Sequence, residues 1–210
     1  MITIQRIEEL AQQALELPVG CGNQHLACLQ ESWAPYLRFM YLCIKTFDVK
    51  FALELGVNKG TCTGHMAYGS SLCSIFGIDI EPNMDALYMQ KEFPNIKALY
   101  RGYTTDPIAV YMIENDVREF GEIGLIFLDS THDGDTPRQE FEVYKHLFAD
   151  ECIVVVDDLL GPRHQMEKMQ EFWQWLPGEK VELHYLHPVP DTHIGIIDQP
   201  GFGVSIVRKA

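Results

Sequence analysis

Short apolar runs alternate with amphipathic stretches along this chain from residue 51 onward. The runs are nearly continuous, which is typical of strands buried on both faces of a parallel sheet. The amphipathic stretches have helical spacing, and Pro82, Pro107 and Pro137 lie near their starts, where proline is tolerated. We predict strands at 51–56, 74–80, 97–102, 123–129 and 152–158, with helices at 61–70, 83–93, 106–119 and 137–149 between them.

The two ends of the chain depart from this alternation. Residues 3–17 have the apolar spacing of a helix, and a second helix is predicted to begin at Pro35. The stretch MEKMQEFWQWL predicts a further helix whose apolar face packs in the core. Two more strands are predicted at 181–186 and 201–209, on either side of a proline-rich loop.

Length and composition limit the domain organisation and the partners. A chain of 210 residues suits one α/β domain, and we predict a helical cap over residues 1–50 on a core of residues 51–210. A net charge of −14 repels phosphate backbones, which argues against nucleic acid and favours a small-molecule partner. No apolar run approaches the ~20 residues needed to cross a bilayer, so no membrane partner is expected. The N-terminus lacks signal-peptide features, and six cysteines without a C-x-x-C pair fit free thiols, so we predict a cytoplasmic protein.

The stretch FALELGVNKG, residues 51–60, joins a predicted strand to a predicted helix through Gly56 and Gly60. Glycines let the backbone approach a ligand, and a helix N-terminus offers free N–H donors, so the turn predicts a nucleotide-type pocket. Asn58 stands where a dinucleotide fingerprint has its second glycine, which argues against a nicotinamide oxidoreductase. A glycine-rich turn with a purely structural role remains the alternative at this point.

An acid follows the turn at the distance where such folds bind a ribose. Asp79 ends the second predicted strand, about 20 residues after the glycines. Its two carboxylate oxygens can accept hydrogen bonds from two adjacent ribose hydroxyls. Glu81 is the second choice, because side chains alternate along a strand and its end is uncertain to a residue or two.

Three more acids end the next two strands: Asp129 in FLDSTH, and Asp157 and Asp158 in VVVDDL. The carboxyl ends of parallel strands share one edge, where three carboxylates repel one another unless a cation lies between them. Oxygen ligands favour Mg²⁺, Mn²⁺ or Ca²⁺ over zinc. Adjacent strand residues face opposite ways, so both Asp157 and Asp158 can serve one metal only where the chain leaves strand geometry. His132 lies three residues after Asp129 and could take a proton from a hydroxyl.

Other polar residues have simpler interpretations. Cys62 follows the glycine turn at a helix start, a position that can lower the pKa of a thiol. His184 and His187 would face opposite sides of a strand, so we expect no joint metal site there. The charged residues of the helix at 137–149 are predicted to form a solvated face. These are Arg138, Glu140, Glu142 and Lys145.

Four segments in order carry a family resemblance: LELGVNKGTCT, GIDIEP, IFLDSTHDGDTPRQEFEVYKHL and CIVVVDDLLGPR. They resemble the metal-dependent class I S-adenosylmethionine (SAM) O-methyltransferases, whose first motif is similar to the E-x-G-x-x-x-G of Glu54, Gly56 and Gly60. The likeness runs from about residue 35 to the C-terminus. It is nearest to a bacterial small-molecule branch that includes macrocin-type sugar methyltransferases and the so-called cephalosporin hydroxylases. It implies a three-layer Rossmann-like methyltransferase fold with a seven-stranded, mostly parallel sheet and an antiparallel last strand.

The same resemblance implies two cofactors, SAM and a divalent cation, with Mg²⁺ the simplest choice. It implies Asp129, Asp157 and Asp158 as metal ligands, and His132 or Asp129 as the catalytic base. Thr131 stands where many bacterial members carry an acid, which leaves the base and the metal affinity open. The residues expected at the cofactor, by motif position or by resemblance, are Glu54, Gly56, Asn58, Gly60, Cys62, Asp79, Gly102, Tyr103, Thr104 and Asp129. By the resemblance, Gly102, Tyr103 and Thr104 lie where such methyltransferases contact adenine.

The sequence therefore predicts SAM-dependent methyl transfer to a hydroxyl of a small metabolite, such as a sugar or a polyketide. The alternative is a catalytically silent binding or scaffold protein on the SAM fold, which the departure at Thr131 allows. Retention of the acid cluster with Glu54 and Asp79 favours the enzyme. The N-terminal helices could cover the sheet edge, cap the substrate pocket or form a homodimer contact, and the sequence does not choose among these.

Overall fold

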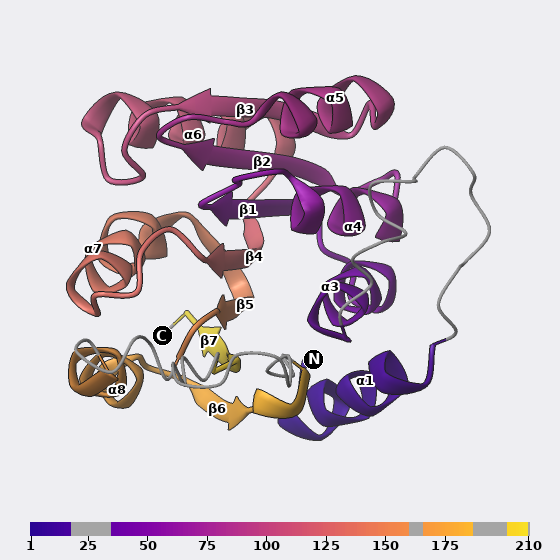
Figure 1. The fold of residues 1–210 in the computed structure, drawn as a ribbon, viewed down its shortest axis with the longest axis vertical. Helices are drawn as coiled ribbons and strands as arrows, with labels where there is room; N and C mark the ends of the chain where they lie inside the picture. The colour runs from indigo at the N-terminus through magenta and orange to yellow at the C-terminus, as the bar shows by residue number, and fades with distance from the viewer. Residues whose placement is uncertain (18–34, 160–165, 187–200, 210) are drawn as a thin grey trace, which may run out of the picture.

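The computed structural model describes residues 1–17, 35–159, 166–186 and 201–209. Its centre is a seven-stranded sheet in the order β3-β2-β1-β4-β5-β7-β6 (Figure 1). β7 (Gly203–Arg208) pairs antiparallel with both β5 (Phe148–Val156) and β6 (Glu179–Glu182). The other strands are parallel, which confirms the predicted Rossmann-like methyltransferase fold with an antiparallel last strand.

The remaining four strands lie close to their predicted positions. They are β1 (Phe51–Leu55), β2 (Ser74–Asp79), β3 (Ile96–Arg101) and β4 (Ile123–Leu128). β1 and β4 are buried along their whole length, as expected for central strands covered on both faces. Alternate residues of β4 serve the two faces: Leu125 and Phe127 join one core cluster, and Ile126 and Leu128 join the other.

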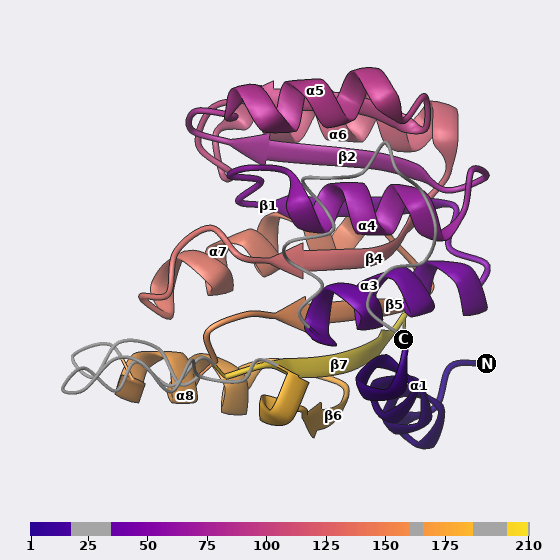
Figure 2. The same ribbon diagram turned by 45° about the vertical axis from the view of Figure 1, so that its right-hand side comes forward.

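Helices cover both faces of the sheet and complete three layers (Figures 1 and 2). Residues of α1 (Ile4–Glu16), α3 (Pro35–Thr46), α4 (Thr61–Gly69) and α5 (Met84–Glu92) belong to one core cluster. Residues of α6 (Pro107–Phe120), α7 (Asp135–Tyr144) and α8 (Met166–Trp175) belong to the other. The apolar stripe of α8, from Met169 to Trp173, is therefore core packing, as its spacing predicts.

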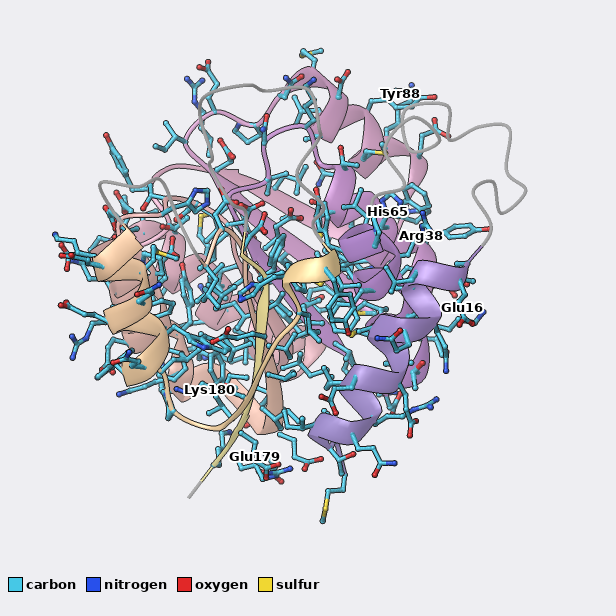
Figure 3. All side chains as sticks on the ribbon, turned by 60° about the horizontal axis from the view of Figure 1, so that its bottom comes forward. Glu16, Arg38, His65, Tyr88, Glu179 and Lys180 are labelled. Atoms are coloured by element: carbon cyan, nitrogen blue, oxygen red, sulfur yellow. The ribbon has the colours of Figure 1, made fainter. Side chains whose placement is uncertain are left out.

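The two described helices of the predicted cap, α1 and α3, pack directly on this core. Arg38 of α3 is buried, and its guanidinium donates to the carbonyls of Ala14 (3.0 Å) and Leu17 (2.7 Å) at the end of α1. A cation is favourable at that position because the last carbonyls of a helix lack intrahelical partners. Arg38 lies beside His65 of α4, which ties the two N-terminal helices to the helix that follows the glycine turn (Figure 3).

Three predicted boundaries were wrong. The helix predicted at 137–149 ends at Tyr144, because a 3-10 turn at Lys145–Leu147 leads into β5, which begins at Phe148 rather than at residue 152. Val143 and Leu147 had extended the helical spacing across this turn. The strand predicted at 181–186 is β6 followed by a 3-10 turn at His184–Leu186.

His187 and the proline-rich loop lie outside the described residues. None of the helices that the structure describes has the length and apolar character needed to cross a membrane. The four described cysteines, Cys43, Cys62, Cys73 and Cys152, are buried free thiols.

Candidate functional site

The predicted site residues gather at the carboxyl ends of β1, β2, β4 and β5, where ligands bind in open α/β sheets. The turn after β1 is built from left-handed backbone: φ is +93° at Gly56, +47° at Asn58 and +72° at Gly60. A Cβ on Gly56 would collide with the main-chain carbonyl of Asp129. Glycine is therefore needed where the turn after β1 touches the backbone that follows β4.

The carboxylate of Asp79 is bonded to this turn. One oxygen accepts from the N–H of Asn58 at 2.8 Å, and the other accepts from the N–H of Glu81 at 2.7 Å. Asn58 thus contributes a backbone donor from left-handed geometry, which asparagine tolerates better than most residues. Glu81 instead reaches Arg101 with its side chain and is exposed. Asp79 is the acid that lies against the glycine turn.

Glu54 and Cys62 lie deeper. Glu54 is buried in β1 and accepts a hydrogen bond from the hydroxyl of Thr63 on α4. Burial raises the pKa of Glu54 well above its usual range. Burial also raises the pKa of the Cys62 thiol, with the charges of Glu54 and Asp129 adding to the effect. The expected lowering of the thiol pKa at the helix start was wrong, because burial in an acidic surrounding outweighs the helix N-terminus.

The acid cluster forms where β4 and β5 end. β5 stops at Val156, and Asp158 follows with φ of +46°, so the chain leaves strand geometry between the two aspartates. Asp157 and Asp158 therefore need not point to opposite faces of the sheet, as adjacent residues within a strand would. His132 lies between the strand ends, with Nδ1 2.9 Å from Asp158 Oδ2 and Nε2 3.5 Å from Asp129 Oδ1.

The charges of this cluster oppose one another. Burial, followed by the charges of Asp129 and Asp158, raises the pKa of Asp157 well above its usual range. Burial likewise raises the pKa of Asp129 against the opposing effect of His132. Burial alone would lower the pKa of His132, but Asp129 and Asp158 outweigh it and bring the pKa to about 10. In this arrangement His132 is an imidazolium at neutral pH.

The donor types of this cluster suit a hard divalent cation, since three carboxylates supply oxygen ligands. Two of them, Asp129 and Asp158, already contact His132. Within the described residues, no three His, Cys, Asp or Glu side chains are arranged to hold a metal ion. The three carboxylates are thus the right type of ligand for a hard cation, but in this structure two of them are arranged around His132 instead.

The residues expected to contact adenine, which follow β3, separate into two groups. Tyr103 is 68% exposed, and Gly102 has open space around the position of a Cβ. Thr104 is buried and directs its hydroxyl to Glu140 Oε1 at 2.5 Å. Glu140 is fully buried, so its assignment to a solvated face was wrong. Arg138 of the same helix stacks on the ring of Trp175 at 4.3 Å.

Sequence reasoning missed two residues near the site. Tyr36 of α3 lies close to the acids: burial raises its pKa well above the usual range, and the charges of Cys62, Asp157 and Asp129 add to this. Glu140 joins Thr104 to Ser130, the residue after Asp129. The sequence around these two residues does not mark either of them as part of a site. Tyr36 has the pattern of a helix residue packed in the core, and Glu140 has the pattern of a surface acid.

Two cavities of about 590 and 530 Å³ lie away from these residues. Both lie at the end of the sheet where the parallel strands begin, here called its amino edge, as opposed to the carboxyl edge where these strands end. At the amino edge Glu151 contacts Arg208, and Glu122 contacts Lys209. The charged residues that line them are thus engaged with opposite charges, which contrasts with the acids at the carboxyl edge.

Comparison with known proteins supports the fold and points to a family. Residues 53–159 match the model of a family described as methyltransferase domain. No curated protein matches the sequence. Among solved structures, an O-methyltransferase of Bacillus cereus in complex with S-adenosylhomocysteine (SAH) is similar at 16% identity, covering 99% of this chain and 93% of its own with a TM-score of 0.61.

Two further structures are similar over nearly the whole chain. One is a Streptomyces achromogenes O-methyltransferase involved in tomaymycin synthesis, in complex with SAM, at 15% identity, 99% and 92% coverage and a TM-score of 0.60. The other is an SAH-bound Podospora anserina methyltransferase at 13% identity, 100% and 98% coverage and a TM-score of 0.63. At these identities the likeness establishes the fold alone.

Proposed function

We propose that this chain, which belongs to the methyltransferase-domain family, transfers the methyl group of SAM to a hydroxyl of a small metabolite with help from a divalent cation. One observation carries the proposal. The glycine turn that holds Asp79 directly abuts the backbone of Asp129, so a cofactor site and an acid cluster share one edge of the sheet. The SAM and SAH complexes of similar fold support the choice of cofactor.

The cofactor would lie over the turn, with its ribose hydroxyls at Asp79 and its methionine end toward Glu54 and Asp129. Asp79 already accepts two backbone N–H groups, and each carboxylate oxygen has room for a second donor. The backbone of Gly56, Asn58 and Gly60 would line the cofactor closely. Cys62, Gly102, Tyr103 and Thr104 complete the proposed contacts, with Thr104 acting through its backbone because its side chain is bonded to Glu140.

Asp129, Asp157 and Asp158 would hold the divalent cation. When bound, such a cation supplies electrostatic stabilisation for the negative charge that develops on the acceptor oxygen. The three carboxylates would also orient the acceptor hydroxyl toward the sulfonium methyl.

The proton of the acceptor hydroxyl would pass to His132 or to Asp129. His132 can accept a proton only when its pKa falls from about 10, which follows if the charges of Asp129 and Asp158 are neutralised. The acceptor oxygen then forms a bond to the methyl carbon while the carbon–sulfur bond breaks, and SAH leaves as a neutral thioether. The protein contributes positioning and a matched charge environment, and the cofactor contributes the activated methyl group.

The first test is calorimetric titration of SAM with and without Mg²⁺, comparing the wild type with Asp79→Ala. We expect micromolar binding that weakens about 30-fold or more in the variant, because a charge-assisted hydrogen bond contributes roughly 2 kcal/mol. Glu81→Ala is the matched control, since Glu81 is exposed on the same loop. Equal SAM affinity in the wild type and Asp79→Ala would refute the cofactor placement.

A catalytically silent SAM-binding protein is the second candidate. It is favoured by the pairing of His132 with two carboxylates, which already balances part of the acid cluster. The two candidates differ in their products: the enzyme releases SAH from SAM in the presence of catechols, sugars or polyketides with Mg²⁺. The silent protein binds SAM with unchanged affinity in Mg²⁺ and releases no SAH.

A further inference from the structure

Glu140 of α7 has no place in the proposed chemistry, yet it is as fully buried as Glu54. Its side chain is fully buried. Oε1 accepts from the hydroxyl of Thr104 at 2.5 Å and from the hydroxyl of Ser130. Oε2 is buried without a hydrogen-bond partner among the described residues. Such burial is costly for a carboxyl group, so its two hydroxyl contacts merit a functional explanation.

The two hydroxyls come from loops that backbone pairing cannot connect. Thr104 follows β3 and Ser130 follows β4, and in the sheet order β2 and β1 lie between these strands. Three strand spacings separate the strand ends by roughly 14 Å. A single carboxylate oxygen nevertheless bonds both loops, so they converge over the sheet edge at Glu140.

A second residue of α7 strengthens the hold on the first loop. Tyr144, one helical turn after Glu140, donates its hydroxyl to the main-chain carbonyl of Thr104 at 2.5 Å. The same loop is tied to the cofactor acid, since the N–H of Gly102 donates to the main-chain carbonyl of Asp79 at 2.9 Å. α7 therefore fixes both the side chain and the backbone of Thr104.

We propose that Glu140 is a positioning residue that holds the loop after β3, on the adenine side of the cofactor, in register with the loop after β4, which carries Asp129. It acts through Thr104 and Ser130 and contacts neither cofactor nor acceptor. This inference rests on the proposed function, because it assigns the two loops to the two halves of the same site. It makes α7 the element that sets the distance between the cofactor and the reacting hydroxyl.

The test compares Glu140→Ala with Glu140→Gln and with Glu142→Ala. Glutamine keeps an oxygen that accepts both hydroxyls, and Glu142 lies on the same helix but is exposed and bonded to Lys145. We expect SAM affinity to fall about tenfold in Glu140→Ala, the loss of roughly one hydrogen bond, and to be restored in Glu140→Gln. Hydrogen exchange should rise in residues 102–106 and 129–132 of Glu140→Ala alone.

Hydrogen exchange separates this inference from the proposed function. If the wild type binds no SAM, the cofactor assignment fails, while faster exchange in both loops of Glu140→Ala still supports the bridge. Unchanged exchange in both loops overturns the inference, as does SAM affinity equal to that of the wild type. Should Glu140→Ala not fold, Thr104→Val and Ser130→Ala remove the same bonds singly. Each is then expected to raise exchange in its own loop, and no change in either loop overturns the bridge.

Discussion

Glu151 and Glu122 at the amino edge of the sheet have cationic partners, whereas the acids at the carboxyl edge mostly have one another. At the amino edge Glu151 contacts Arg208 at 3.0 Å and the N-terminal amine at 3.7 Å, and Glu122 contacts Lys209 at 2.6 Å. At the carboxyl edge Asp157 lies buried beside the partly exposed Asp129, which has the imidazolium of His132 as its cationic neighbour. The same sheet thus has acids in ion pairs at one end of its strands and acids clustered together at the other end.

This difference separates residues in ordinary surface ion pairs from residues that prepare a site. Exposed ion pairs such as those of Glu151 contribute little individually. Massed buried carboxylates cost stability, because burial and mutual repulsion both oppose their ionised forms. Groups kept at such a cost are typical of functional sites, where a ligand supplies the missing charge.

The largest effect is expected for Asp157→Asn. Loss of one carboxylate should reduce SAH release at least about 100-fold, since a proposed direct ligand should matter more than an outer contact. The melting temperature should rise, by about 2–4 °C for each kcal/mol of buried like-charge repulsion that is removed. Measuring SAH release and thermal unfolding on one preparation of Asp157→Asn checks both the expected loss of turnover and the expected rise in melting temperature.

An intermediate effect is expected for Glu140, a buried acid that accepts hydrogen bonds from two hydroxyls and is not part of an ion pair with any of the described residues. Burial raises the pKa of Glu140 to about 7, against the opposing effect of its bonds to Ser130 and Thr104. The folded state therefore keeps a proton that the unfolded state releases, so stability falls as pH rises from about 4.5 to 7. Relative to Glu140→Gln, the wild type should lose up to about 3 kcal/mol across this window.

Urea unfolding of both proteins at pH 5 and pH 8 measures that difference. Glu142→Gln is the control, because Glu142 is exposed and should follow the wild type. Parallel stability curves for the wild type and Glu140→Gln would show that Glu140 does not titrate in this window.

The smallest effect is expected for Glu151→Gln at the amino edge. Its contacts with Arg208 and the N-terminal amine are partly exposed, so the loss should stay below about 1 kcal/mol and shrink at high salt. SAM affinity should remain that of the wild type. A loss of stability as large as the Glu140 effect, or a change in SAM affinity, would erase the contrast between the two edges.

The elements that the sequence predicted best are those with strong local signals. β1, β2 and β4 are apolar runs bounded by glycines or acids, and the glycine turn is marked by two residues that need left-handed backbone. Position at strand ends was enough to bring Asp79, Asp129 and Asp157 to one edge. The seven-stranded, mostly parallel sheet with an antiparallel last strand was implied by the family resemblance, and the strand order was not predicted, because periodicity does not encode which strands are neighbours.

The misses have a common physical cause. Glu140 looks like a surface acid in QEFEVY, and it is buried only because Thr104 and Ser130 arrive from distant loops. The end of α7 was misplaced because Leu147 continued the helical spacing into a 3-10 turn. The pKa of Cys62 was misjudged because burial, a tertiary property, outweighs the local effect of a helix start.

The place of β7 between β5 and β6 has a consequence for synthesis on the ribosome. β6 precedes β7 in the sequence, and among the strands that the structure describes it pairs with β7 alone. Until residues 203–208 leave the exit tunnel, β5 presents the run Ile153–Val156 as an open strand edge, and β6 has nothing to pair with. Such an edge is prone to association with other nascent chains, so translation stalled before Gly203 should yield a chaperone-dependent intermediate.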